Sequence, residues 1–174
     1  DYFKNLDNYK DAFYKVMKNV TDNLVINNDD LNIKSMKELK NPVSYGKDIA
    51  ADFKVQSPGT FIYENNKYEI KSDIIGDHFK SNMLGAIILA LLNGIEIKDS
   101  LNAIESFAGV KRRIELIGIS KGVLIYDDYG HHPTEMEATI TALKQQTKSK
   151  LYVVFQPHRY TRTMEFFSSF KDSL

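Results

Sequence analysis

Two short runs hold most of the unusual polar chemistry of this 174-residue chain. Residues 126–135 read YDDYGHHPTE, and residues 155–163 read FQPHRYTRT. Three of the four histidines and two of the four arginines lie in these runs, although the chain has 19 lysines. An arginine fork holds a phosphate or carboxylate through two parallel hydrogen bonds, which a lysine point charge cannot do. The two runs are therefore the first candidates for an anion-binding site.

The acidic and imidazole side chains of these runs also have structural interpretations. Asp127 and Asp128 fit a solvated turn, and paired histidines such as His131 and His132 are sometimes structural. With His158 they could in principle bind zinc, but the chain has no cysteine and no HExxH spacing, so we expect no metal site. Taken together with the arginines, the set favours a functional site.

The residues after His132 are typical of a helix start. Pro133 suits the first helical turn, whereas Thr134 with Glu137 three residues later predicts a capping box. We expect these residues to serve the helix and not the chemistry.

Two further pairs are candidates for ligand contact. His78 and Asn82 lie four residues apart near a predicted helix start, so they share one face and could read a flat polar edge. The alternative for them is a helix cap and a surface residue. Arg112 and Arg113 are adjacent in a chain that otherwise uses lysine, which favours a phosphate contact over surface salt bridges.

Hydrophobic periodicity predicts the elements that must position these residues. The predicted helices are 7–19, 35–39, 77–93, 99–107, 134–147 and 162–174; the predicted strands are 23–26, 43–45, two or three antiparallel strands within 52–71, and 114–119, 123–126 and 151–155. The strand, helix, strand, helix order after residue 109 predicts a parallel sheet with right-handed crossovers. We therefore predict an α/β protein, with antiparallel strands and helices in residues 1–108 and a parallel β-α-β-α segment in residues 109–174.

This topology brings the two polar runs together. If strands 123–127 and 151–155 are parallel, the loops after them emerge at the same carboxyl edge, where ligands bind in such sheets. Each loop then runs into a helix N-terminus, which favours an anion. The residues expected to converge are Asp127, Asp128, Tyr129, His131 and His132 with Gln156, His158, Arg159 and Arg162.

Composition narrows the class of protein. The 23 basic and 23 acidic residues balance, so the chain shows no electrostatic footprint of a nucleic-acid binder. The longest apolar stretch, Met83 to Leu92, is about half the roughly 20 residues of a membrane span. The absence of cysteine suits a reducing cytoplasm. Because the chain begins at Asp1 inside an amphipathic segment, we expect it to be part of something longer.

The residues resemble the Mur ligases of peptidoglycan synthesis. The similarity covers LDNYKDAF, VINNDD, GDHFKSNMLGAI and GVKRRIE, and it is most specific in YDDYGHHPTE and FQPHRYTRT. It implies the later part of a central ATP-binding domain in residues 1–108 and the first part of a Rossmann-like C-terminal domain in residues 109–174. It also implies ATP-dependent ligation of L-alanine to UDP-N-acetylmuramate through an acyl phosphate, in the cytoplasm.

The resemblance assigns roles to individual residues. His78 and Asn82 match positions that contact adenine, Arg113 a position on the phosphate side and Asp128 one that contacts ribose. Positions lining the muramate and alanine site match Tyr129, His131, Arg159 and Arg162, of which His131, Arg159 and Arg162 are the catalytic candidates.

The chain departs from the family in its phosphate loop. None of its nine glycines stands in a GxxxxGK[ST] run, and the expected Mg²⁺ ligands fall upstream of Asp1. We expect the chain alone to be inactive. The alternatives are the ligase that reattaches recycled tripeptide, a folate-type relative, and a non-catalytic nucleotide-binding module.

Overall fold

The computed structural model describes residues 3–36 and 39–174, and the chain forms two compact units. The sheet unit consists of the described residues of Tyr2–Ser72 and Phe79–Phe107. The hairpin unit consists of Asp73–His78 and Ala108–Leu174. The predicted division into residues 1–108 and 109–174 stays a prediction.

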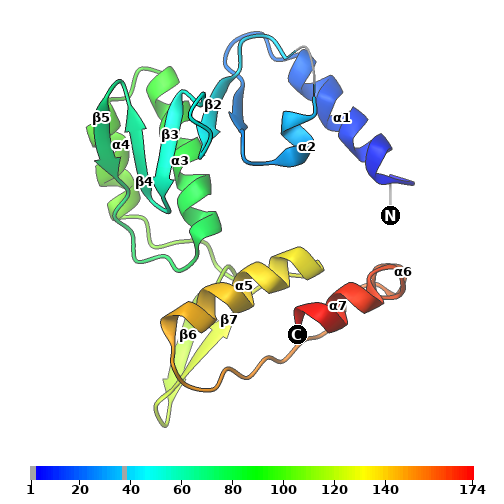
Figure 1. Cartoon of the computed structure of the whole chain (residues 1–174). Coiled ribbons are helices and arrows are strands. Elements are labelled where there is room, and N and C mark those ends of the chain that lie inside the picture. Colours follow the sequence, from blue (N-terminus) through cyan, green and yellow to red (C-terminus); the bar gives the residue numbers. More distant parts are fainter. Residues whose placement is uncertain (1–2, 37–38) are drawn as a thin grey trace. The chain divides into compact units, whose positions relative to one another are not determined.

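The sheet unit is built on a mixed five-stranded sheet whose strands follow chain order (Figure 1). The strands are β1 (Val25–Asn27), β2 (Val43–Gly46), β3 (Phe53–Ser57), β4 (Thr60–Tyr63) and β5 (Asn66–Glu69). β1, β2 and β3 pair in parallel, whereas β3, β4 and β5 pair antiparallel. The turn between β4 and β5 places Glu64 and Asn65 at φ 48° and 64°, the left-handed geometry that suits a tight hairpin. The prediction of antiparallel strands within residues 52–71 is confirmed.

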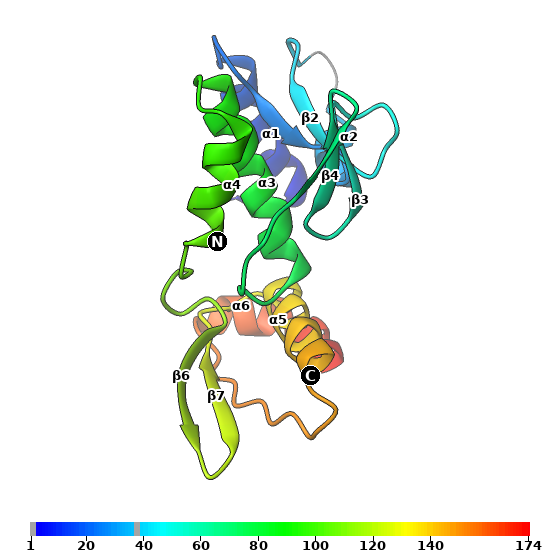
Figure 2. The same cartoon turned by 90° about the vertical axis from the view of Figure 1, so that its left-hand side faces the viewer.

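Two helices, α3 (Asp77–Leu92) and α4 (Ile97–Glu105), lie along one face of this sheet (Figures 1 and 2). Phe53 and Phe61 from the strands and Ile87 and Ile88 from α3 are each at most 2% exposed. These side chains form the core of the unit, and their burial is its main source of stability.

The first helices of the sheet unit are α1 (Leu6–Lys18) and α2 (Leu31–Lys34). The side chain of Asp30 caps α2 by accepting hydrogen bonds from the backbone N–H groups of Asn32 and Ile33. The prediction of a helix at 35–39 is wrong for the residues of that range that the structure describes. The helix begins earlier, at Leu31, and ends at Lys34, with Ser35 as its C-cap. Residues 37–38 of that prediction lie outside the described residues.

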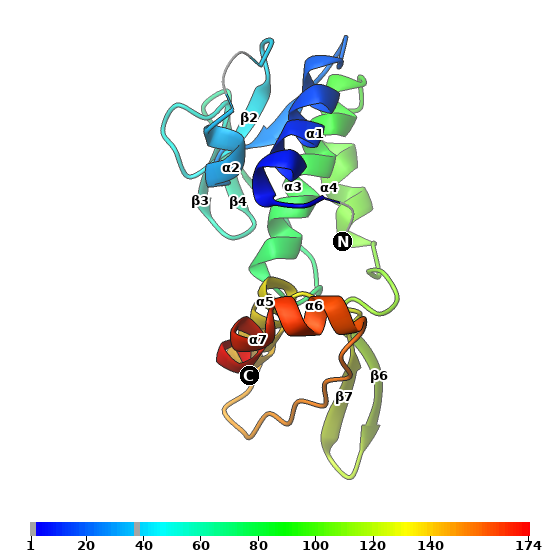
Figure 3. The ribbon, with the colours of Figure 1, turned by 90° about the vertical axis from the view of Figure 1, so that its right-hand side faces the viewer.

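The hairpin unit contains β6 (Glu115–Ser120), β7 (Val123–Asp127), α5 (Pro133–Gln146), α6 (Tyr160–Glu165) and α7 (Phe167–Ser173). β6 and β7 pair antiparallel around Lys121 and Gly122, whose φ values of 49° and 81° match a two-residue hairpin turn. α7 packs beside α5 (Figures 1 and 3), and its Phe170 is 6% exposed. The predicted helix 162–174 is divided into α6 and α7 at Phe166.

The prediction of a parallel sheet in the hairpin unit is wrong for the residues described. Residues 151–155 are extended but form no strand, and the unit's sheet consists of the antiparallel pair β6 and β7. A strand of a parallel sheet is covered on both faces. Here Tyr152 and Val154 are 79% and 99% exposed, so one face of the segment is bare. A cavity of about 180 Å³ lies between this segment, the end of β7 and α5, in place of a backbone ladder.

Among residues 3–36 and 39–174, no helix has the length and apolar character needed to cross a membrane.

Candidate functional site

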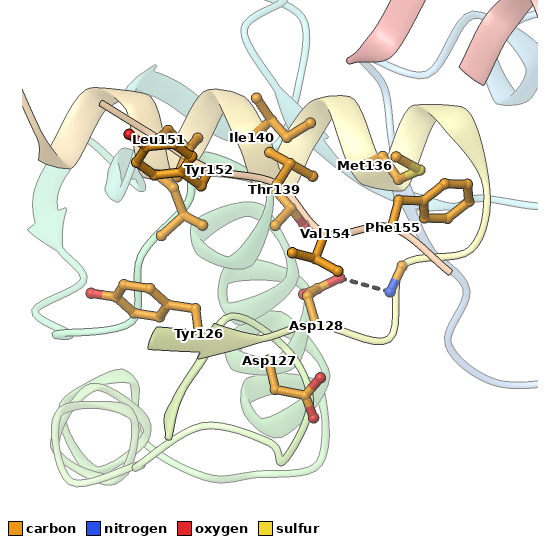
Figure 4. A pocket seen from close by; sticks show the side chains of 13 residues that line it. Tyr126, Asp127, Asp128, Met136, Thr139, Ile140, Leu151, Tyr152, Val154 and Phe155 are labelled. Atoms are coloured by element: carbon orange, nitrogen blue, oxygen red, sulfur yellow. Dashed lines mark hydrogen bonds between the residues drawn. The ribbon is translucent and has the colours of Figure 1, made fainter. Parts of the chain in front are cut away.

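The loop between β7 and α5, residues 128–132, is fixed at its start by Asp128. Its Oδ2 accepts a hydrogen bond from the N–H of Ile114 at 2.9 Å, and its Oδ1 accepts one from the N–H of Gly130 at 2.7 Å (Figure 4). A Cβ atom at Gly130 would lie 2.7 Å from that Oδ1, so only glycine allows this approach. Each carboxylate oxygen keeps a second lone pair, which can accept a hydrogen bond from a ligand hydroxyl.

Arg112 contacts Asp127, the last residue of β7, and Tyr129 in the loop. Its Nε lies 3.3 Å from Asp127 Oδ2, and its guanidinium carbon lies 4.6 Å from the centre of the Tyr129 ring. The N–H of Tyr129 also donates a hydrogen bond to the carbonyl of Arg112 at 2.8 Å. An ion pair and a cation–π contact thus occupy this arginine, so it serves to position Tyr129.

The start of α5 differs from the predicted capping box of Thr134 with Glu137. His132 is the N-cap, its Nδ1 accepting from the N–H of Thr134 at 3.3 Å, and Glu135 completes the capping box. The physical reason is Pro133: it has no N–H to donate, and its fixed φ suits the first helical residue, so the cap must lie one residue before it.

Glu135 connects this helix start to two candidate residues. Its Oε2 accepts hydrogen bonds from the N–H groups of His131 and His132 at 3.0 and 3.2 Å. Its Oε1 lies 3.6 Å from an amino nitrogen of Arg113. Burial raises the pKa of the Glu135 carboxyl, but the His131 hydrogen bond and the charges of His131 and Arg113 outweigh it, so the net shift is downward.

The imidazole of His131 has a defined orientation. Its Nδ1 lies 3.0 Å from the carbonyl oxygen of Tyr129. A carbonyl oxygen can only accept, so Nδ1 must carry the hydrogen, and the neutral ring then keeps its lone pair on Nε2. The side chain is 34% exposed, and its ring meets Tyr129 edge-on at 5.3 Å between centroids. This tautomer can accept a proton from a ligand at Nε2.

His78 lies in the hairpin unit at the start of α3. Burial lowers the pKa of its imidazole, the charges of Asp128 and Asp77 oppose this shift, and the charge of Arg113 adds to it. A groove of about 340 Å³ runs beside it and is lined by Asp77, His78, Thr134, Glu137, Ala138, Thr141, Ala142 and Gln145. Asn82 follows one turn along α3, is exposed, and belongs to the sheet unit.

The second polar run is only partly joined to the first. Arg159 is exposed with φ 70° at the N-cap of α6, and Arg162 is half-buried on that helix. In the part of the chain that the structure describes, no hydrogen bond or ion pair links the Arg162 side chain to residues 127–132. His132 of the first run makes an edge-on contact with Phe166, three residues beyond the end of the second run, with centroids 4.8 Å apart. The predicted convergence at a shared sheet edge is therefore not formed, because residues 151–155 are not a strand.

The cavity between the two runs is mainly apolar. Met136 and Ile140 from α5, Tyr126 from β7 and residues 151–155 line it, with Asp127 and Asp128 at one end. Figure 4 shows Asp127 pointing away from Val154 and Phe155. The residues that the structure describes contain no cluster of three or more histidine or acidic side chains that could hold a metal ion.

In the hairpin unit, Glu135 contacts Arg113 and His131, and the ring of His131 meets that of Tyr129. His78 lies within electrostatic reach of Asp128 and Arg113. Two family descriptions cover most of the chain: the Mur ligase middle domain matches residues 1–90, and the Mur ligase, glutamate ligase domain matches residues 112–174. The chain belongs to the Mur ligase family.

Known Mur ligases that the chain matches are longer than the chain. It is 39% identical over 98% of its length to UDP-N-acetylmuramate–L-alanine ligase of Clostridium botulinum, of which it covers 40%. The structure of UDP-N-acetylmuramate–alanine ligase from Thermotoga maritima matches 98% of this chain and 39% of its own, with a TM-score of 0.74 and 26% identity. A murein peptide ligase from Psychrobacter arcticus shares the fold, with a TM-score of 0.61 at 24% identity over 90% of this chain and 36% of its own. The chain spans about two fifths of the length of these relatives.

Sequence reasoning missed Glu135 in this Mur ligase segment. Thr134 and Glu137 have the usual capping-box spacing, so the capping box was assigned to them and not to Glu135, which lies between them. The signal was present, since Glu135 stands three residues after His132 and two after a proline that fixes the helix start.

Proposed function

We propose that this chain is part of a cytoplasmic, ATP-dependent ligase that joins L-alanine to the carboxylate of UDP-N-acetylmuramate in peptidoglycan precursor synthesis. The names of two relatives that each align with 98% of the chain support this assignment. The observation that carries it is the contact of Glu135 with both Arg113 and His131, whose ring meets Tyr129, in a chain of this family. Within the complete enzyme, residues 1–108 would be the later part of a central ATP-binding domain and residues 109–174 the first part of a Rossmann-like C-terminal domain.

The chemistry of the side chains fits a nucleotide. A lowered pKa keeps His78 neutral, with one donor and one acceptor for a nucleobase edge, and Asn82 would add an amide. Asp128 keeps lone pairs for a ribose hydroxyl, and Arg113 keeps donors for phosphate beyond its contact with Glu135. ATP supplies the phosphoryl group that activates the carboxylate. The described residues offer no cluster for Mg²⁺, so its use stays an expectation from the family resemblance.

The acceptor side would be formed by Tyr129, His131, Arg159 and Arg162. Transfer of the terminal phosphoryl group of ATP to a carboxylate oxygen gives an acyl phosphate and ADP. The amine of alanine then forms a bond to the acyl carbon, and phosphate leaves with the electrons of the broken C–O bond. The amine nitrogen loses a proton in this step, which the Nε2 lone pair of His131 is suited to accept. Arg159 and Arg162 would hold carboxylate or phosphate oxygens.

The test uses the complete enzyme with UDP-N-acetylmuramate, ATP and either L-alanine or the tripeptide, and follows ADP and the ligated product by mass spectrometry. We expect faster turnover with L-alanine. Glycine and serine should be poor but detectable substrates, because one methylene group is worth only about 1–3 kcal/mol in such discrimination. Faster use of the tripeptide would instead identify the recycling ligase. Nucleotide binding with no turnover of either acceptor would indicate a non-catalytic module.

A further inference from the structure

Glu135 contacts two residues to which the proposed function gives separate roles. Its Oε2 accepts from the N–H groups of His131 and His132 and lies 3.8 Å from His131 Nδ1. Its Oε1 faces Arg113 at 3.6 Å. One side chain therefore spans the proposed proton acceptor and the proposed phosphate-side arginine.

Helix capping explains only half of these contacts. A glutamate at this position of a capping box needs one oxygen, which reaches back to the amides before the helix. In this chain Oε2 makes those bonds, and Oε1 is left to pair with Arg113. Neighbouring Arg112 is turned to Asp127 and Tyr129 instead, so the two adjacent arginines are held by different partners.

The pairing with Arg113 restricts a mobile group. The Arg113 side chain is 40% exposed, and a free arginine side chain loses rotamer entropy when it binds a ligand. An ion pair that limits its orientations beforehand reduces that loss, which is the physical basis of preorganisation. The lowered pKa of Glu135 keeps its carboxylate charged through neutral pH, so the pairing persists there.

We propose that Glu135 is a positioning residue for the ligase reaction, with one carboxylate oxygen fixing the backbone that carries His131 and the other orienting Arg113 toward the phosphate groups of the nucleotide. The inference rests on the proposed function. It assigns no direct contact between Glu135 and substrate.

Glu135→Gln in the complete enzyme separates the two oxygens. A glutamine oxygen still accepts from the two histidine N–H groups, so the helix cap is retained, but the neutral amide gives Arg113 no charge partner. We expect kcat/KM for ATP to fall roughly tenfold, since small losses of positioning have effects of this order or larger. Glu135→Ala removes both interactions, and we expect a larger fall, on the order of 100-fold.

A double-mutant cycle with Arg113→Ala distinguishes positioning from structure. If Glu135 acts through Arg113, Glu135→Gln should change kcat/KM for ATP by less than about twofold in the Arg113→Ala background, because coupled residues are not additive. Glu105→Gln is the control, because Glu105 is an exposed glutamate on α4 that makes no side-chain hydrogen bond or ion pair among the described residues. Equal losses from Glu135→Gln in both backgrounds, or no loss in either, would overturn the inference.

The Kd for ATP of each variant in the same double-mutant cycle is also measured by calorimetry, with neither alanine nor tripeptide present. If the wild-type enzyme binds ATP but ligates neither alanine nor tripeptide, the proposed function fails, while coupling of residues 135 and 113 in the Kd still decides whether Glu135 orients Arg113. If the enzyme ligates alanine and the Kd shows no coupling, the positioning role alone is wrong. The melting temperature of each variant shows whether a loss of binding reflects unfolding.

Discussion

The charge state of His78 is set by opposing interactions. Burial lowers its pKa, the carboxylates of Asp128 and Asp77 raise it, and Arg113 lowers it further, with a net downward shift. The folded protein therefore binds fewer protons than the unfolded chain as pH falls through the ordinary histidine range, near about 6.5. Stability contributed by neutral His78 is present above that range and is lost as the pH falls toward the folded pKa. The His78 imidazole therefore stays neutral near neutral pH, where it would contact a nucleobase.

The first prediction concerns His78→Ala in the complete enzyme. Losing one neutral hydrogen bond costs about 0.5–1.5 kcal/mol, so we expect the KM for ATP to rise roughly two- to thirteenfold. Turnover at saturating ATP should change little, because a base contact is equally strong in the ground state and the transition state. In the wild type, the KM for ATP should stay constant through neutral pH and rise only below the ordinary histidine range. His78→Gln should restore part of the affinity, and a large loss of turnover at saturating ATP would refute the assignment.

The candidate site was predictable from side-chain chemistry but not from local geometry. Scarcity of arginine pointed to Arg112, Arg113, Arg159 and Arg162, of which the structure places Arg113 beside Glu135. The position of Asp128 after a predicted strand pointed to the loop. Sequence spacing could not separate Arg112 from Arg113, which have different partners in a backbone where Arg112 and Ile114 adopt φ values of 60° and 50°. A positive φ in non-glycine residues is a product of the fold around them and leaves no pattern in the sequence.

At the scale of elements, α3 is the main contributor to the core of the sheet unit. Ile88 is 0% exposed, whereas Leu89, the next residue of the same helix, is 46% exposed. We predict that Ile88→Ala lowers the free energy of unfolding by about 2–5 kcal/mol, through lost burial and the cavity left behind. Leu89→Ala should cost at most about 1 kcal/mol. Urea denaturation with an unchanged slope measures both, and equal losses would contradict this account of the core.

Elements with a strong local period were predicted well, and those that depend on neighbours were not. Helix α5 and the turn at Gly122 follow from residues within a few positions. Residues 151–155 have the apolar composition of a buried strand, but a strand also needs a hydrogen-bonded neighbour and cover on both faces. In the described structure a cavity lies beside the segment and Val154 is 99% exposed, so the local signal is not realised.

At the scale of the whole molecule, the chain matches two domains of the Mur ligase family. Its matches to the Mur ligase middle domain and to the glutamate ligase domain fall on residues 1–90 and 112–174. Phosphoryl transfer depends on a backbone cradle for the phosphates and on a bridging metal ion. None of the nine glycines stands in GxxxxGK[ST], and the described residues hold no cluster of three metal-ligating side chains.

We therefore predict that the 174-residue chain by itself neither hydrolyses ATP nor ligates alanine. Residues proposed for adenine, ribose and acceptor contacts are present, so weak nucleotide binding is compatible with this outcome, whereas turnover is not. The measurement is phosphate release by the isolated chain with ATP, Mg²⁺ and UDP-N-acetylmuramate, with and without L-alanine, beside the complete enzyme as a positive control. Alanine-dependent phosphate release by the chain alone, abolished by His131→Ala, would show that the phosphate cradle is dispensable and would overturn the prediction.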